Sequence, residues 1–229
     1  MVAAPRRAAP RPNLLELSRM PYRAVIFDLG GVVLGSPLHA IAAYEREVGL
    51  PEGFVNRVVA DSGAEGGWSR LERGELSMEA FYPVFEADCE ARGHTLSARE
   101  LMVRVHAATE PRPAMIEAVR RIRDRPLLAA ALTNNWISEE SQGTGLLRPH
   151  FDAFVESSVV GMRKPDPRIY THTCETLGVA AEETVFLDDI GRNLKPARAL
   201  GMTTIKVDAP DVALEELSGV LGFPLGATA

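Results

Sequence analysis

The stretch that decides the fold reads AVIFDLGGVV over residues 24–33. Its first four residues form an apolar run of the kind found in strands that are buried on both faces. Asp28 follows this run directly, and Gly30 and Gly31 then permit backbone conformations that other residues avoid. A carboxylate at this place predicts either a ligand site at a strand end or a strand-ending Asp in a glycine turn.

Four further apolar or β-branched runs have the length of strands, and polar turns and helical patterns follow most of them. The five expected strands span residues 24–29, 127–134, 153–156, 184–188 and 203–207. Strands that alternate with helices are typical of a parallel sheet covered on both faces. The sequence therefore predicts an α/β fold with a doubly wound parallel sheet.

About a hundred residues separate the first expected strand from the second, far more than one crossover helix needs. Most of this segment has helical spacing, and Ser97 with Glu100 matches a capping box. We expect a helical insert here. The predicted divisions are 21–36 and 112–208 for the core, 37–111 for the insert, and 209–229 for a C-terminal helix and tail.

The first 20 residues carry several Arg and Pro residues, one acid and no long apolar stretch. A secretory signal needs an apolar centre and is not expected. The simplest interpretation of residues 1–20 is a disordered tail or a start misplaced upstream of Met20. An organellar transit peptide stays open, because such peptides are also Arg-rich and poor in acids.

Composition argues against several classes of partner. The chain has 25 Lys and Arg against 31 Asp and Glu, a formal net charge of -6, so no broad basic face is available for nucleic acid. No apolar run approaches the ~20 residues of a membrane-spanning helix. Cys89 and Cys174 are too few for a disulfide framework and suit buried positions in a reducing compartment. We expect a cytoplasmic protein, monomer or homodimer, with a small-molecule ligand.

Polar residues stand where the expected strands end. They are Asp28, Thr133 with Asn134, Lys164, and Asp188 with Asp189. Ligands of open parallel sheets bind at the carboxyl ends of the strands, so we expect these side chains to converge. The Thr133 hydroxyl and nearby backbone N–H groups can hold phosphate oxygens, although a simple turn is the competing interpretation.

The adjacent acids Asp188 and Asp189 follow an apolar strand. Because side chains alternate along a strand, we expect one acid to reach a ligand while the other supports it. Carboxylate and carbonyl oxygens are ligands that Mg²⁺ prefers, and a metal between Asp28 and Asp189 would offset their repulsion. The alternative is that the acid pair caps the helix that contains Asn193.

The segment GMRKPDP over residues 161–167 holds Lys164 just before an expected helix. Asp166 can cap that helix and Pro167 suits its first position. A solvated lysine is the usual case, but these restraints on both sides favour a lysine that is aimed at a ligand.

Together these motifs resemble the haloacid dehalogenase-like hydrolase superfamily, whose members carry an Asp, a Thr or Ser, a Lys and paired acids in this order. The resemblance covers about residues 21–208 and is strongest to the N-terminal phosphatase domain of soluble epoxide hydrolase and to related sugar-phosphate phosphatases. It implies a Rossmann-like core with a helical cap inserted after the first strand. Trp68, Phe81 and Tyr82 would lie in that cap, in a substrate pocket or in its apolar core.

The resemblance also implies a mechanism and a set of roles. The chain would hydrolyse small phosphomonoesters with Mg²⁺, through an aspartyl-phosphate that water then hydrolyses. The implied catalytic residues are Asp28 and Lys164, the substrate-binding residues are Thr133, Asn134 and Lys164, the metal ligands are Asp28, the Gly30 carbonyl and Asp189, and the supporting residues are Asp188 and Asn193.

The chain departs from the family pattern at Gly30. Phosphatases of this family usually carry a second Asp there, which protonates the leaving oxygen, and such acid or base help is typically worth ~10²- to 10⁴-fold. Two alternatives therefore remain. One is a dehalogenase that uses Asp28 without metal, although such enzymes normally carry Tyr at this place. The other is a weakly active or non-catalytic binding protein.

Overall fold

A five-stranded parallel sheet forms the centre of the protein, with the strand order β3-β2-β1-β4-β5. The computed structural model describes residues 21–137 and 142–226, so the expected tail at residues 1–20 lies outside the described residues. The strands are β1 (Ala24–Phe27), β2 (Leu128–Thr133), β3 (Ala153–Glu156), β4 (Thr184–Asp188) and β5 (Thr203–Lys206). β1 lies in the middle, and the chain extends the sheet to either side of it. This order confirms the predicted doubly wound α/β fold.

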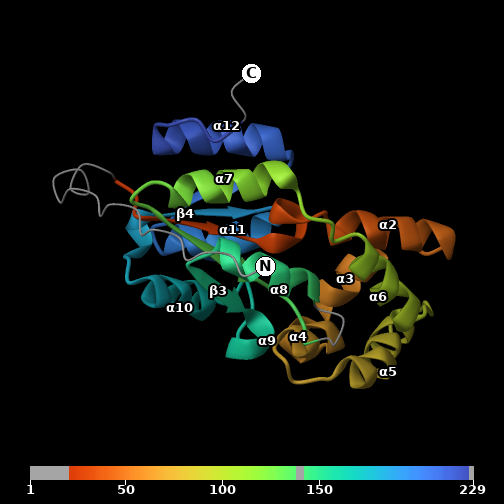
Figure 1. The fold of residues 1–229 in the computed structure, drawn as a ribbon. Helices are drawn as coiled ribbons and strands as arrows, with labels where there is room; N and C mark the ends of the chain where they lie inside the picture. Colours follow the sequence, from red (N-terminus) through yellow and green to blue (C-terminus); the bar gives the residue numbers. More distant parts are fainter. Residues whose placement is uncertain (1–20, 138–141, 227–229) are drawn as a thin grey trace, which may run out of the picture.

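Helices cover both faces of this sheet (Figure 1). α7 (Pro113–Arg123) and α12 (Pro210–Leu221) pack on one face, and α10 (Pro167–Leu177) and α11 (Gly191–Ala199) pack on the other. Val25 and Phe27 point into the apolar cluster that contains α7 and α12, whereas Ile26 points into the one that contains α10 and α11. All of β1 is therefore buried, which explains its unbroken apolar sequence. The short helices α8 (Gln142–Leu147) and α9 (Ser157–Val160) flank β3.

The long segment between β1 and β2 is helical and extends to one side of the sheet (Figure 1). It contains α2 (Pro37–Glu47), α3 (Phe54–Asp61), α4 (Gly67–Glu72), α5 (Met78–Glu90) and α6 (Ala98–Ala107), which we call the helical insert. These helices bury an apolar cluster of their own around Phe81 and Phe85. At the start of α6, the Ser97 hydroxyl accepts a hydrogen bond from the Glu100 N–H at 3.2 Å. That the insert acts as a separate cap over the site stays a prediction.

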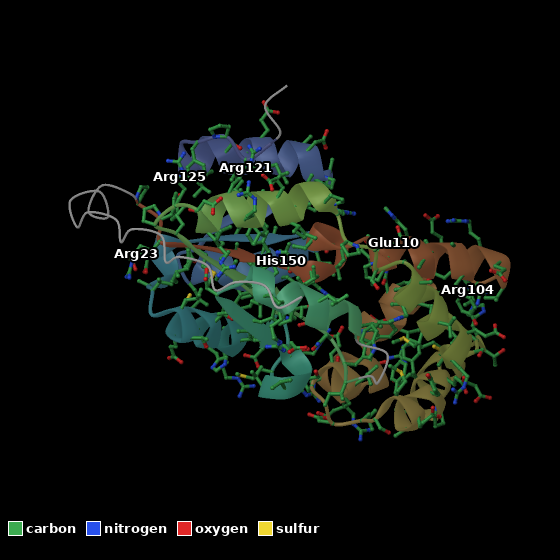
Figure 2. The ribbon with its side chains drawn as sticks, viewed as in Figure 1. Arg23, Arg104, Glu110, Arg121, Arg125 and His150 are labelled. Atoms are coloured by element: carbon green, nitrogen blue, oxygen red, sulfur yellow. The ribbon has the colours of Figure 1, made fainter. Side chains whose placement is uncertain are left out.

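Two connections join the helical insert to the core, and they run side by side. Leu34 pairs with Pro111 in an isolated antiparallel bridge, and the Gly35 N–H donates to the Glu110 carbonyl at 2.9 Å. Glu110 marks this crossing in Figure 2. A Cβ atom at Gly35 would lie 2.1 Å from the carbonyl oxygen of Ala108, so this close approach requires glycine.

The end of the described chain packs against α7. Arg121 donates to the Gly226 carbonyl at 2.5 Å, and the Arg125 guanidinium lies 5.0 Å from the centre of the Phe223 ring. Figure 2 shows both arginines between α7 and α12. No helix among the described residues combines the length and apolar character that a membrane crossing requires.

Candidate active site

The register of the sheet brings the ends of three strands to the same level. Phe27 pairs with Ala131 of β2 and with Leu187 of β4, and the Asp28 N–H donates to the Leu187 carbonyl at 2.9 Å. A cavity of about 200 Å³ opens at this edge. The predicted site residues that line it are Asp28, Gly30, Thr133, Asn134, Lys164, Asp189 and Asn193. The expected convergence is therefore present, with Asp188 fully buried beside the cavity.

Asp28 stands where β1 ends, and only 6% of its surface is exposed. Its Oδ1 atom accepts hydrogen bonds from the Leu29 N–H at 2.7 Å and from Lys164 Nζ at 2.8 Å. Among the described residues none donates to Oδ2, which leaves that oxygen available at the cavity. Burial raises the pKa of Asp28 well above its ordinary value, with Asp188 adding to the shift and Lys164 opposing it.

Lys164 is a cation that lines the cavity, and it is 1% exposed. Its ammonium group lies between Asp28 Oδ1 at 2.8 Å and Asp188 Oδ2 at 2.7 Å. Burial alone would lower the pKa of Lys164, but the two carboxylates outweigh it and the pKa is raised. The restraint after Lys164 is also as predicted, because Asp166 caps α10 by accepting from the Arg168 N–H at 3.0 Å. Lys164 is therefore a fixed, charged group.

Of the two adjacent acids, Asp189 lines the cavity and Asp188 is buried beside it, but strand alternation does not explain this difference. Asp189 already lies beyond the end of β4, so strand alternation does not separate it from Asp188. The carboxylates of Asp28, Asp188 and Asp189 each offer an oxygen within 4.8 Å of the others. Asp188 accepts from the Ile190 N–H at 2.8 Å and, with both oxygens, from Asn193 Nδ2 at 3.1 Å. The alternative of a helix-capping pair is wrong, because Ile190 occupies the N-cap position of α11 without a side-chain cap.

The acidic cluster has the properties of a divalent-cation site. Asp189 Oδ1 is buried and has no hydrogen-bond partner among the described residues, while Oδ2 has only a long contact of 3.4 Å from the Ser36 hydroxyl. Burial and the neighbouring Asp188 raise the pKa of Asp189 to about 6. A cation would satisfy this oxygen and lower the pKa of both Asp28 and Asp189. The free oxygens of Asp28 and Asp189, with Asp188 close by, therefore fit a hard cation such as Mg²⁺.

Gly31 keeps the backbone close to this cluster. Its φ angle is +81°, and a Cβ atom there would lie 1.9 Å from Asp189 Oδ2. Gly30 differs, because its φ is −64° and a Cβ atom would meet only the Pro37 ring at 3.4 Å. The first glycine of the pair thus has room for a side chain, and the second does not.

Thr133 and Asn134 close β2 at the same cavity. The Thr133 hydroxyl has only a long contact of 3.4 Å, to the Asn134 carbonyl, and is available to a ligand. The Asn134 amide is occupied, since Oδ1 accepts from the Lys164 N–H at 2.8 Å and Nδ2 donates to the Lys164 carbonyl at 3.0 Å. Sequence reasoning assigned Asn134 only a backbone role, and it missed this clamp on Lys164.

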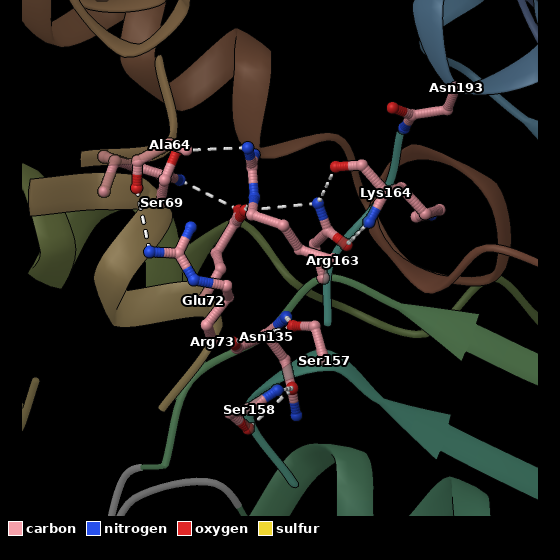
Figure 3. Close-up of polar contacts among 12 residues, drawn as sticks. Ala64, Ser69, Glu72, Arg73, Asn135, Ser157, Ser158, Arg163, Lys164 and Asn193 are labelled. Atoms are coloured by element: carbon pink, nitrogen blue, oxygen red, sulfur yellow. Dashed lines mark hydrogen bonds and ion pairs between the residues drawn. The ribbon is translucent and has the colours of Figure 1, made fainter. Parts of the chain in front are cut away.

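Sequence reasoning also missed Glu72 and Arg163, which lie at the same cavity. Glu72, from α4 of the helical insert, accepts from Arg163 Nε at 2.5 Å and from Asn134 Nδ2 at 3.1 Å (Figure 3). A weak signal existed, because Arg163 directly precedes Lys164 in the chain. Periodicity did not reveal that Glu72 turns toward the core.

The helical insert supplies the apolar wall of the cavity. This wall comprises Leu38, Ile41, Val55, Val59, Trp68 and Val105. Of the three aromatic residues considered for a pocket, Trp68 lines the cavity, and Phe81 is fully buried in the insert's own cluster. Tyr82 packs against that cluster, with the Arg99 guanidinium 4.4 Å from its ring centre.

The chain is similar in sequence to several known proteins. The model of haloacid dehalogenase-like hydrolases matches residues 22–201. Acyl-CoA dehydrogenase family member 10 of Mus musculus is 39% identical over 208 residues, which are 89% of this chain and 20% of the relative. Bifunctional epoxide hydrolase 2 of Sus scrofa is 37% identical over 221 residues, which are 90% of this chain and 40% of the relative. The chain thus spans less than half the length of these relatives.

Solved structures with the same fold include a family enzyme of Bacteroides thetaiotaomicron in complex with magnesium and inorganic phosphate. It is 19% identical, with a TM-score of 0.56 over 81% of this chain and 93% of that chain. Proteins named as dehalogenases share the fold at 21% to 22% identity. Relatives named as phosphatases match by sequence at 24% to 30% identity. The chain belongs to the haloacid dehalogenase-like hydrolase family.

Proposed function

We propose that this hydrolase is a magnesium-dependent phosphatase that acts on small phosphomonoesters through an aspartyl-phosphate on Asp28. One observation carries the proposal: the Lys164 ammonium is fixed 2.8 Å from Asp28, beside an acidic cluster that contains a buried, unpartnered oxygen. A cation in that cluster, together with Lys164, would present two positive centres beside the carboxylate nucleophile. A phosphoryl group, with its negatively charged oxygens, matches such a site.

Each residue of the site has a separate role in the proposed reaction. When bound, Mg²⁺ would be held by Asp28, Asp189 and the Gly30 carbonyl and would neutralise charge on the transferring oxygens. An oxygen of Asp28 attacks phosphorus, and the bond from phosphorus to the organic oxygen breaks. The other phosphoryl oxygens are bound by Lys164, the Thr133 hydroxyl and the Asn134 N–H. Water then attacks the acyl phosphate, which releases phosphate and restores the Asp28 carboxylate.

The supporting residues hold this geometry. Asp188 holds the Lys164 ammonium at 2.7 Å, and Asn193 donates to both oxygens of Asp188. Gly30 has no side chain that can transfer a proton, and we assign no other residue as the general acid. We therefore expect faster turnover of substrates with good leaving groups, such as aryl phosphates.

The apolar wall of the helical insert bears on the substrate class. A cavity of about 200 Å³ with a charged end and an apolar end fits a compact phosphomonoester whose organic group has an apolar face. The relatives named as phosphoglycolate and sesquiterpene phosphatases support a phosphomonoester, but their named substrates differ widely in polarity.

The test measures phosphate release from an aryl phosphate, a sugar phosphate and an alkyl phosphate, with Mg²⁺ or with EDTA. We expect release only with Mg²⁺, and a fall of ~10⁴-fold or more in kcat for Asp28→Asn. Asp211→Asn, at an exposed position on α12, is the control and should match the wild type. Metal-independent release of chloride from 2-chloropropionate, without phosphate release, would instead support a dehalogenase.

A further inference from the structure

We infer that Glu72 is a positioning residue through which the helical insert sets the geometry of Asn134 and Lys164, two of the residues proposed to bind phosphate. This inference rests on the proposed function. Glu72 lies at the end of α4, and 7% of its surface is exposed. Its position in the insert is far in sequence from every residue that would bind phosphate. It nevertheless contacts Asn134 directly, and through Asn134 it is linked to Lys164.

The Glu72 carboxylate gathers three donors from two parts of the molecule. Oε1 accepts from Trp68 Nε1 at 2.9 Å within α4. Oε2 accepts from Arg163 Nε at 2.5 Å and from Asn134 Nδ2 at 3.1 Å, both of which belong to the core. Arg163 also donates to the Ser69 hydroxyl at 3.1 Å, which adds a second bond between Arg163 and α4 (Figure 3).

These contacts bear on how the Asn134 amide holds the Lys164 backbone. A carboxylate accepts hydrogen bonds and cannot donate them, so Glu72 requires the NH₂ side of the Asn134 amide. With that side fixed, Oδ1 faces the Lys164 N–H at 2.8 Å, and Nδ2 also reaches the Lys164 carbonyl at 3.0 Å. A flipped amide would place Oδ1 against the Glu72 carboxylate and Nδ2 against the Lys164 N–H. The Glu72 carboxylate and the Lys164 backbone thus favour the same amide orientation, and Glu72 reinforces the clamp on Lys164.

Charge explains why Arg163 accompanies Glu72. An unpaired carboxylate in the cavity wall would repel a phosphate dianion and would be costly to bury. The Arg163 guanidinium neutralises it, and both side chains are largely buried, with 15% and 9% exposed. Arg163 is then engaged with Glu72 and Ser69, and its backbone neighbour Lys164 is the cation that we assign to the phosphoryl oxygens.

The experiment uses the double variant Glu72→Met with Arg163→Met, because removing both partners leaves no unpaired buried charge and the protein should fold. The single variant Glu72→Met is measured beside it. Glu75→Met is the matched control, since Glu75 lies three residues away, pairs with Arg73 at 2.6 Å and does not line the cavity. Two quantities are measured with Mg²⁺ present: kcat, and the Kd for inorganic phosphate from tryptophan fluorescence. Trp68 and Trp136 both line the cavity and report on its occupancy.

We expect the double variant to lower kcat by ~10- to 100-fold, the penalty typical of a small misplacement of binding groups. The Kd for phosphate should rise about 10-fold, and Glu75→Met should match the wild type in both quantities. Loss of stability alone would not change the Kd of the folded protein. Circular dichroism at the assay temperature checks that each variant is folded. A folded double variant with wild-type kcat and Kd would overturn the inference. If the wild type binds phosphate but releases none from any ester, the proposed function fails, and the Kd still decides the role of Glu72.

Discussion

The two walls of the cavity are built on different principles. The wall at the strand ends is charged and buried, and short ion pairs run through it from Asp28 through Lys164 to Asp188. The wall of the helical insert is mostly apolar and packs by shape, with Val59 and Trp68 as examples. If the proposed function holds, the reaction should depend on the first wall and the choice of substrate on the second. Substitutions in the two walls should therefore fail in different ways.

The physical reason is the asymmetry between charge pairing and apolar contact. Removal of one member of a buried ion pair leaves an uncompensated charge and typically costs ~3 to 5 kcal/mol. A shortened apolar side chain at a cavity wall loses contact area but leaves no unpaired charge. Glu72 departs from this pattern, because it is a buried acid of the insert that accepts hydrogen bonds from Arg163 and Asn134 of the charged wall.

Apart from Asp28→Asn, the largest effect should follow from Lys164→Met. This change leaves Asp28 and Asp188 buried without their cation, so we expect a loss of ~3 to 5 kcal/mol in the free energy of unfolding. Activity should fall ~10²-fold or more, as for the loss of a group that stabilises the transition state. Urea denaturation and phosphate release measure the two effects.

The control for that prediction is Lys206→Met. Lys206 pairs with Asp208 at 2.5 Å, but the two side chains are 51% and 74% exposed, so this pair should contribute almost nothing. Equal stability losses in the two lysine variants would contradict the contrast between a buried and an exposed cation.

An intermediate effect is expected for Gly30→Asp, which would add an acid to the charged wall. The backbone at Gly30 suits any residue, and a Cβ atom there makes only an ordinary contact with Pro37. The rate on an alkyl phosphate should rise ~10²-fold, because a poor leaving group gains most from protonation, and the rate on an aryl phosphate should change little.

Gly30→Ala is the control, because it adds bulk at this position without adding an acid. Both rates should stay near those of the wild type. An unchanged ratio of alkyl to aryl rates in Gly30→Asp would show that another proton source already serves the leaving oxygen.

The smallest effect should come from the apolar wall. Val59→Ala removes two methyl groups that face the cavity, so kcat/KM for a substrate with an apolar organic group should fall ~10-fold. The value for a compact polar phosphomonoester should stay near that of the wild type. Val103→Ala, on the exposed surface of α6, is the control and should change neither substrate. An equal loss for both substrates would mean that the insert does not select by apolar contact.

Much of the core was predictable because its signals are local. The apolar run before Asp28 and the one before Asp188 each predicted a strand, and the rule that ligands meet at the carboxyl ends of parallel strands predicted that their acids converge. The orientation of Asp189 was not predictable in this way. Strand alternation ceases at Asp188, and the path of the chain beyond it depends on Ile190 and on the close approach of Gly31.

The sequence by itself determined the doubly wound sheet, the strand ends and the polar residues placed there, because short apolar runs and glycine turns act over a few neighbouring residues. Only the tertiary structure decided that Trp68 lines the cavity while Phe81 fills the insert, and that Glu72 reaches Arg163 and Asn134. A helical period shows which face of a helix is apolar, but whether that face meets its own core, a cavity or another part of the chain depends on packing over long range.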